Sequence, residues 1–213
     1  MFVLNSNPSL ANQFLFELRD AAIQRDRMRF RKNLERLAEI LAYEISKSLV
    51  YEKAVAQSPL GASKTQVIHE QPVLLTILRA GLPFFQGFIN FFDRADAGFI
   101  GAFRKEDEDH LTIKLEYLAT PSLQGRTVVL IDPMLATGRS IIDSVNAIMR
   151  NGKPAHIHIA CLVAAPEGIK YLEDNLKLPY SIWACAVDER LNAQFYIVPG
   201  LGDAGDLSFG DKL

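Results

Sequence analysis

The sequence predicts an α/β fold: a central, mostly parallel sheet flanked by helices. Two observations favour this class. Short apolar runs of strand length alternate along the chain with segments of helical periodicity, which indicates strands joined through helices. One run, Thr127–Ile131, is almost purely β-branched, as expected for a strand that is buried on both faces.

An amphipathic helix is expected first, between Asn33 and Ser48. Its apolar residues recur at helical spacing and would pack one stripe on a core: Leu34, Leu37, Ala38, Leu41 and Ile45. Four arginines alternate with other residues just before it: Arg25, Arg27, Arg29 and Arg31. A solvated or subunit-facing basic stretch is the simpler interpretation. Contact with a bound phosphate is the other.

The rest of the chain alternates between expected strands and helices. The strands are Val73–Leu78, Ala97–Phe103, Thr112–Leu118, Thr127–Ile131, His156–Val163 and Ser181–Val187. The helices are Pro83–Phe92, Ser140–Arg150 and a short one near Ile169–Asn175. A charged turn is expected at Arg104–Asp109, and a glycine-rich loop at Pro199–Gly210. We expect one domain over residues 1–213, with an N-terminal helical segment at 1–50.

The composition excludes several classes of protein. A net charge of −2 argues against a protein held to nucleic acid mainly by phosphate neutralisation, although a local basic patch stays open. No apolar run approaches the roughly 18–20 residues of a membrane helix, and the first residues lack the pattern of a signal peptide. Cys161 and Cys185 stand far apart without a CxxC partner. We therefore expect a soluble protein of the reduced cytoplasm.

The most informative stretch leads from the β-branched strand into a helix: Asp132, Pro133, Met134, Leu135, Ala136, Thr137, Gly138, Arg139 and Ser140. A helix N-terminus offers unpaired N–H groups and the positive end of a dipole to a phosphate. Asp132, at the carboxyl end of its strand, can accept hydrogen bonds from two ribose hydroxyls. The simpler interpretation is that Thr137 or Ser140 only caps the helix. Neither GxxxxGK[ST] nor GxGxxG is present.

This stretch resembles the signature by which type I phosphoribosyltransferases bind phosphoribosyl pyrophosphate (PRPP), in the Asp-Pro-Met-Leu-Ala-Thr-Gly form of the uracil phosphoribosyltransferase family. Three further stretches resemble that family in the same order: Ile77–Leu82, Cys161–Gly168 and Tyr196–Asp206. The resemblance extends from about the N-terminal helix to the C-terminus. It implies the type I phosphoribosyltransferase fold and a reaction of pyrimidine salvage, in which uracil and PRPP give UMP and pyrophosphate.

The resemblance also implies roles for individual residues. Arg79 and Arg104 would hold the departing pyrophosphate, and residues 132–140 would bind the phosphoribosyl group. Residues 195–213 would form a base-binding loop and tail, in which backbone groups of Ile197, Gly202 and Ala204 contact uracil. Asp203 would face the ribose, the base or the water shell of Mg²⁺. The magnesium would be bound mainly through PRPP, with no direct protein ligand. A homo-oligomer, a dimer or larger, is expected.

Three positions depart from the family pattern. Arg139 replaces a second glycine, Ala119 a loop lysine, and Leu207 an arginine, so that lid closure, rate and regulation are in question. A PRPP- or UMP-sensing regulator that binds RNA is the main alternative, against which the net charge and the uracil loop both argue. A relative that uses orotate or a purine is a third. Orotate would require a cation near the base, and Leu207 supplies none.

His156 and His158 should share one face of a strand, because side chains alternate along it. Two histidines without a third ligand make a poor metal site, so ordinary strand positions are expected. Trp183 is expected to pack in the core rather than to stack on a base.

Overall fold

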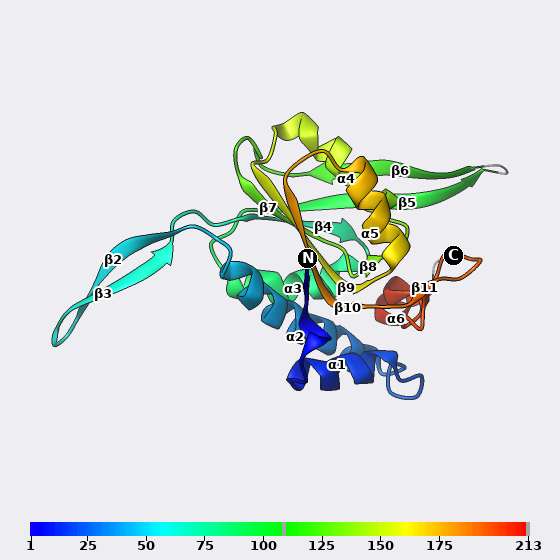
Figure 1. Ribbon diagram of the computed structural model, residues 1–213, viewed down its shortest axis with the longest axis horizontal. Coiled ribbons are helices and arrows are strands. Elements are labelled where there is room, and N and C mark those ends of the chain that lie inside the picture. The colour runs from blue at the N-terminus through cyan, green and yellow to red at the C-terminus, as the bar shows by residue number, and fades with distance from the viewer. Residues whose placement is uncertain (108–109, 212–213) are drawn as a thin grey trace.

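The centre of the protein is an eight-stranded sheet with the order β1-β10-β9-β7-β4-β5-β6, in which β8 also pairs with β9 (Figure 1). The structure is a computed structural model that describes residues 1–107 and 110–211. Between residues 102 and 116 it describes the backbone alone. The strands are β1 (Phe2–Val3), β4 (Val73–Leu78), β5 (Ala97–Asp107), β6 (His110–Ala119), β7 (Thr127–Ile131), β8 (Met134–Leu135), β9 (His156–Ala164) and β10 (Tyr180–Val187). The β5–β6 pair is antiparallel and the other pairs of this sheet are parallel, so the predicted fold class is confirmed.

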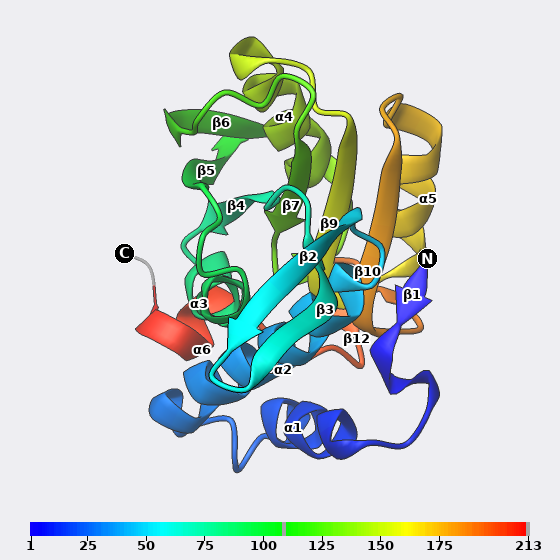
Figure 2. The ribbon, with the colours of Figure 1, turned by 90° about the vertical axis from the view of Figure 1, so that its left-hand side faces the viewer.

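Helices cover both faces of the sheet. The helices are α1 (Leu10–Arg19), α2 (Arg27–Ser46), α3 (Gly81–Phe91), α4 (Arg139–Ile148), α5 (Pro166–Asn175) and α6 (Ala204–Phe209). Buried residues of α1, α2 and α3 pack with Val129 and Ile131 of β7, whereas α4 and α5 pack with Val128 and Leu130. Figure 2 shows α1, α2 and α3 together on one face. Because successive strand residues point to opposite faces, the apolar run of β7 fills two cores.

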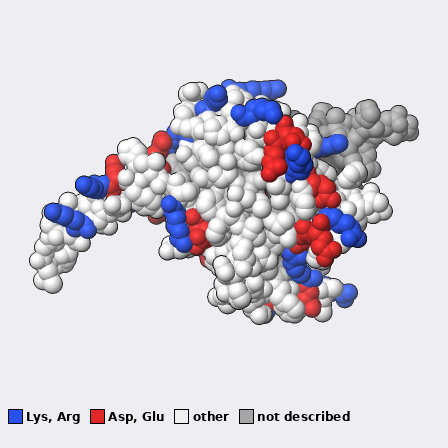
Figure 3. Space-filling view, in the orientation of Figure 1, with Lys and Arg blue, Asp and Glu red and all other residues white. Residues whose placement is uncertain are grey.

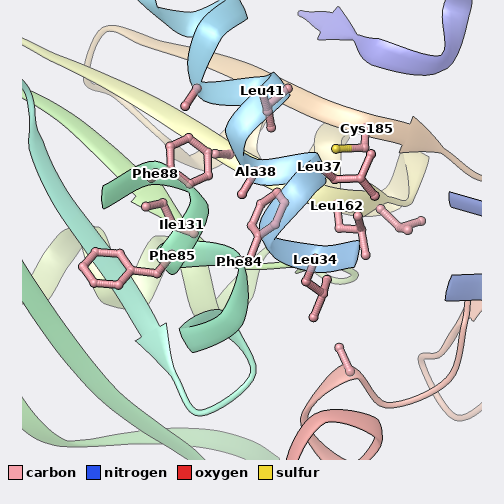
Figure 4. Packing of buried hydrophobic residues seen from close by; sticks show 14 of the residues in the cluster. Leu34, Leu37, Ala38, Leu41, Phe84, Phe85, Phe88, Ile131, Leu162 and Cys185 are labelled. Carbon is pink, nitrogen blue, oxygen red and sulfur yellow. The ribbon is translucent and has the colours of Figure 1, made fainter. Parts of the chain in front are cut away.

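The larger core lies where α2 and α3 cross over the strands. Leu34, Leu37, Ala38 and Leu41 of α2 meet Phe84, Phe85 and Phe88 of α3 above Ile131 (Figure 4). The two helices approach closely at Gly87, where a Cβ would lie 2.2 Å from the backbone oxygen of Glu35. The stripe predicted for α2 is therefore confirmed, and the helix begins earlier than expected, after an Asp26 cap that accepts a hydrogen bond from the Arg29 amide.

Several elements differ from the predictions. The sequence patterns did not indicate β1, α1 or a hairpin formed by β2 (Tyr51–Ser58) and β3 (Gly61–Ile68). The predicted turn at Arg104–Asp109 was wrong for residues 104–107, which extend β5, while residues 108–109 lie outside the described part. Cross-strand hydrogen bonds outweigh the charged composition there, since Arg104 pairs with Ile113 in the β5–β6 register. The helix expected at Ser140–Arg150 ends at Ile148 and continues as a 3₁₀ turn.

The predicted loop at Pro199–Gly210 was also wrong in part, because Ala204–Phe209 forms α6. Asp203 starts this helix: its Oδ1 accepts hydrogen bonds from the amides of Gly205 and Asp206, at 2.8 and 3.0 Å. A side chain that satisfies the first amides of a helix offsets the weak helical propensity of glycine. Two short strands, β11 (Arg190–Leu191) and β12 (Ile197–Val198), precede this region.

Within the described chain, none of the helices has the length and hydropathy needed to cross a bilayer. The two cysteines are buried and unpaired. Burial raises the pKa of both thiols, which keeps them protonated and unreactive.

The two histidines of β9 do share one face, as predicted, with ring centroids 4.6 Å apart. Trp183 of β10 donates a hydrogen bond from Nε1 to Nδ1 of His158 at 3.0 Å and packs against the larger core. Nε2 of His156 lies 2.7 Å from the hydroxyl of Ser181. The described residues contain no third metal-ligating side chain here. Both histidines therefore belong to the packing of the sheet.

His158 should make the protein acid-sensitive. Burial, and then the neighbouring His156, lower the pKa of His158 to about 4. An unfolded histidine titrates near 6.5, so the stabilising contribution is complete above that pH and is lost as pH falls from about 6.5 to about 4. The loss approaches about 3 kcal/mol, from 1.36 kcal/mol per pKa unit. Urea unfolding at pH 7 and pH 5, followed by the fluorescence of Trp183, the only tryptophan, should show about 2 kcal/mol of this loss, because pH 5 still lies above the folded-state pKa.

The matched variants are His158→Asn and His69→Asn. Asparagine at 158 can accept the bond from Trp183 but does not titrate in this range, so the loss between pH 7 and pH 5 should shrink. His69 lies exposed on the hairpin side, where its ring contacts Glu52. Glu52 raises the pKa of His69, so this histidine contributes stability that grows as pH falls, and its replacement should enlarge the loss between pH 7 and pH 5, opposite to the effect of His158→Asn. An equal pH dependence in His158→Asn and the parent protein would contradict the assignment.

Candidate active site

The predicted functional residues gather at one edge of the sheet. Strands β4, β7 and β10 run parallel and end at the same edge, where they are followed by Arg79, Asp132 and Asp188. The carboxyl ends of parallel strands are where open α/β sheets bind ligands. Figure 1 places α6 and the C-terminal segment beside the same edge.

Residues 132–140 connect β7 to α4 and include the two-residue strand β8 and the first residues of α4. Gly138 has φ 77°, the left-handed conformation, and stands at the N-cap of α4. A Cβ at this position would lie 2.9 Å from the backbone oxygen of Gly168 and 3.2 Å from the ring of Tyr171. Glycine is therefore needed both for the backbone angle and for the contact with α5. The N-terminus of α4 opens directly from this turn, as a phosphate cradle requires.

The start of α5 holds the other side of the turn. A Cβ on Gly168 would lie 2.3 Å from the backbone oxygen of Ala136. The Ala165 amide donates to the oxygen of Leu135 at 2.9 Å. In the sequence, Gly168 resembles the family only as part of a turn after a strand. Its close contact with Leu135 and Ala136 depends on the tertiary structure. Gly168 is thus a residue of the site that sequence reasoning missed.

Asp132 follows the last residue of β7 without a break in pairing. Its amide donates to the oxygen of Ala160 on β9 at 3.1 Å, and its Oδ1 accepts from the Met134 amide at 3.2 Å. The carboxylate is therefore fixed at the strand end by its own turn. Thr137 contributes a weaker contact, in which its hydroxyl accepts from the Arg139 amide at 3.4 Å. Arg139 is exposed, while Ser140 is half-buried in the first turn of α4.

The predicted base-binding loop is anchored by an ion pair. Arg19 of α1 donates to both carboxylate oxygens of Asp188, at 2.7 and 2.9 Å, and to the Gly200 oxygen at 3.1 Å. Asp188 in turn accepts from the Gly200 amide at 2.7 Å. Gly200 has φ 59°, and a Cβ there would lie 2.1 Å from the oxygen of Ile197. A buried carboxylate paired twice to one arginine holds the loop in place. Sequence reasoning missed both charged residues because they lie 169 positions apart.

Arg79 and Asp203 are brought together around Gly205. A Cβ on Gly205 would lie 3.1 Å from Oδ1 of Asp203 and 3.8 Å from Nε of Arg79. Arg79 also reaches α6 directly, through Nη2 bonds of 2.7 Å to both Asp206 and the Gly210 oxygen. The residue expected to bind pyrophosphate and the residue expected at the ribose are thus neighbours.

A cleft of about 590 Å³ opens beside these residues. Its lining comes from two parts of the chain: Gln24, Arg25, Arg27, Leu201, Gly202, Asp203, Asp206, Leu207 and Asp211. Acidic and basic groups of similar number face the space, and Figure 3 shows charges of both signs over α5 and α6. The cleft therefore has no single sign of charge, which is suited to a polar ligand.

The four alternating arginines that precede and begin α2 differ in their surroundings. Arg25 and Arg27 line it, whereas Arg29 pairs with Glu17 at 3.2 Å and Arg31 donates to the Ser208 oxygen at 2.7 Å. Arg25, Arg27 and Arg29 are exposed, as the simpler interpretation expects, whereas Arg31 is half-buried. Arg31 instead connects α2 to α6.

The remaining predicted residues fall near this edge with one exception. Ile197 and Ala204 are buried in the apolar cluster that includes Ile131, and Met134 and Ala136 pack against the same cluster. Pro133 and Leu135 are buried under the turn, while Gly202 is exposed at the cleft with φ 94°. The side chain of Arg104 lies outside the described residues. One apolar cluster therefore positions residues 132–140 and the predicted base-binding loop relative to each other.

Comparisons with known proteins identify the family. A family model described as uracil phosphoribosyltransferase matches residues 5–211. A uracil phosphoribosyltransferase of Porphyromonas gingivalis is 44% identical over 211 residues, which cover 99% of this chain and 98% of the relative. One of Methanothermobacter thermautotrophicus is 37% identical over 85% of this chain and 83% of its own length. Among solved structures, the AQ2163 protein of Aquifex aeolicus is similar with a TM-score of 0.85 and 34% identity, covering 99% of this chain and 98% of that protein.

Proposed function

This chain belongs to the uracil phosphoribosyltransferase family, and from that membership we propose that it converts uracil and PRPP to UMP and pyrophosphate. The bond from C1 of the ribose to the pyrophosphate oxygen breaks. A new bond joins C1 to N1 of uracil, which loses its proton. The observation that carries the proposal is the meeting of a phosphate turn, a base loop and Arg79 at one edge of the sheet. The enzyme class accords with the family rather than with an RNA-binding regulator.

The phosphate turn would hold the nucleotide half of PRPP. The 5′-phosphate would lie at the N-terminus of α4, against amides of residues 137–140 and the hydroxyls of Thr137 and Ser140. Asp132, fixed at the end of β7, would accept hydrogen bonds from the ribose hydroxyls. These contacts are made equally by substrate and product, so they bind and orient rather than lower the barrier directly.

The base loop would read uracil with backbone groups. Gly202 is exposed at the cleft with a positive φ, so its main chain can approach a ligand closely. Uracil carries a donor and acceptors along one edge and can pair with main-chain groups of Ile197, Gly202 and Ala204. Cytosine would bring an amino donor against another donor. A site that leaves such groups unpaired rejects the wrong base strongly.

Charge changes at C1 decide the chemical step. As the C1–O bond breaks, negative charge grows on the pyrophosphate and positive charge on the ribose, as in glycoside hydrolysis. Arg79 would stabilise the pyrophosphate, together with Arg104, and the carboxylate of Asp203 would stabilise the ribose. Oδ1 of Asp203 accepts hydrogen bonds from two backbone amides. Its Oδ2 is therefore the oxygen that would contact a ligand in the cleft.

We propose that Mg²⁺ is the cofactor and is bound mainly by oxygens of PRPP. Mg²⁺ keeps several of its waters and commonly binds through substrate phosphates, so few protein ligands are needed. Asp203 at the cleft carries carboxylate oxygens of the hard type that magnesium prefers. When bound, the ion would neutralise charge on the pyrophosphate.

The test is a turnover assay with several bases. Purified protein with Mg²⁺ and PRPP should form UMP from uracil, and its kcat/KM for uracil should exceed that for cytosine by a factor on the order of 10⁴. Orotate and purines should react as poorly as cytosine. Absence of UMP at every metal concentration would refute the enzyme, and salt-dependent RNA binding without turnover would favour the regulator.

We propose further that the protein is a homodimer, assembled in part by the β2–β3 hairpin. The hairpin projects from the body of the molecule (Figure 1), and 14 of its 16 strand residues are exposed, that is all but Ala54 and Ile68. A hairpin without further packing is marginal in water, so a second copy would stabilise it. Light scattering should give about twice the chain mass of 23.8 kDa, and a monomer would contradict the proposal.

We also propose a cytoplasmic location, which the two unpaired thiols support. Fractionation of cells tests it.

A further inference from the structure

The guanidinium of Arg79 is held by α6 through a single nitrogen. Its Nη2 donates to Oδ1 of Asp206 and to the backbone oxygen of Gly210, each at 2.7 Å. A guanidinium has five N–H donors, two of them on Nη2. Both Nη2 donors are therefore used, and the three that remain are on Nε and Nη1.

The Nε atom is buried and has no hydrogen-bond partner among the residues that the structure describes. Buried unpaired donors are rare in folded proteins and call for an explanation. This one lies beside the space at Gly205, with Oδ1 of Asp203 on the other side of that space. The unused donors of Arg79 thus lie next to the carboxylate that we place at the ribose. A ligand oxygen is the missing partner that the geometry suggests.

We propose that Asp206 is a positioning residue for Arg79. By holding Nη2, Asp206 and the Gly210 oxygen set the plane of the guanidinium so that its free donors face the pyrophosphate of PRPP. The inference rests on the proposed function and deepens it, because it assigns a role to a residue that does not touch the substrate. The same short helix then holds both Asp203, which caps it, and Arg79, so that it would orient two residues toward PRPP.

Asp206 has an opposing effect that decides how the test is designed. Its negative charge lies next to an anion site and disfavours pyrophosphate. The side chains of Arg79 and Asp206 are each 35% exposed, so their charge attraction is screened by water and their short hydrogen bond sets the geometry. Asparagine at position 206 keeps the acceptor and removes the charge. Alanine removes both, so the two variants separate orientation from electrostatics.

The experiment compares the parent protein with Asp206→Asn and Asp206→Ala. Steady-state kinetics give KM for PRPP and for uracil, and calorimetry gives the affinity for pyrophosphate alone. We expect Asp206→Asn to keep KM for PRPP within about threefold, and Asp206→Ala to raise it about tenfold or more, with pyrophosphate affinity reduced in parallel. KM for uracil should change less than threefold in both.

The control is Asp96→Ala, which removes an aspartate paired with Arg126 at 3.2 Å at the opposite edge of the sheet. It should leave both KM values unchanged. Circular dichroism checks folding, and Asp206→Ser, whose hydroxyl is too short to reach Arg79, replaces the alanine variant if that one does not fold.

Each other outcome overturns the inference. If both Asp206 variants bind pyrophosphate more tightly, Asp206 only competes with the substrate. If KM for uracil rises in step with KM for PRPP, it only holds α6 in place. Failure of the proposed function is a different result: the parent protein itself would form no UMP, whereas the pyrophosphate titrations would still compare the variants.

Discussion

Asp203→Asn is expected to lower kcat for UMP formation about 100-fold while leaving the folded protein as stable as the parent. The turnover effect follows from charge, because an amide cannot stabilise the positive charge that develops on the ribose. Stability is retained because Asp203 starts α6 through Oδ1, which accepts from the amides of Gly205 and Asp206. Asparagine carries the same oxygen and is as good an N-cap.

Asp203→Ala completes this comparison. It removes the cap as well as the charge, so it should reduce turnover to a similar level and also cost about 1 kcal/mol of unfolding free energy. Thermal unfolding together with initial rates at saturating PRPP measures both effects. Near-normal turnover in Asp203→Asn would remove Asp203 from the chemistry and leave it as a helix cap alone.

Gly138→Ala is expected to raise KM for PRPP by about 10- to 100-fold. The added methyl group would lie 2.9 Å from the Gly168 oxygen, a contact that requires the phosphate turn or α5 to move. Displacement of a binding group by a fraction of an ångström weakens every contact that depends on its position. Alanine at φ 77° also costs about 1 kcal/mol, from the crowding of its Cβ in the left-handed conformation.

Gly125→Ala is the matched control for this prediction. Gly125 has φ 72°, nearly the same angle, but nothing lies within 4 Å of the position that its Cβ would take. Both variants should lose the unfolding free energy of a left-handed alanine, measured in urea, but Gly138→Ala should lose more because of its contact with the Gly168 oxygen, and only Gly138→Ala should raise KM for PRPP. Equal KM values would show that backbone strain, and not the contact with α5, decides the behaviour of Gly138.

The sequence was sufficient to predict the local structure of residues 127–148, a strand followed by a turn and a helix. The β-branched strand, the carboxylate at its end and the Thr-Gly-Arg-Ser helix start are contiguous, so the turn between β7 and α4 depends on neighbouring residues. The same holds for the stripe of α2, whose spacing alone indicates a buried face. Family resemblance added the assignment to uracil, which the family match confirmed.

Patterns of composition failed where pairing or capping overrode them. The charged segment after Phe103 was expected to turn, but strand pairing extends it to Asp107. The glycine-rich C-terminal region was expected to be a loop, but the Asp203 cap stabilises α6. In both cases a polar composition typical of loops is compatible with regular structure once backbone hydrogen bonds are satisfied.

What the sequence determined by itself is the fold class, the strand, turn and helix of residues 127–148, and the family, because each depends on residues that are close along the chain. What only the tertiary structure decided is how these parts meet. Arg19 forms an ion pair with Asp188, and Arg79 forms one with Asp206. Gly168 packs closely against the backbone of Ala136. Such contacts join segments that are distant in sequence, and their partners are set by the packing of α1, α5 and α6 around the sheet edge. No periodicity in the sequence encodes them, so they appear only in the folded chain.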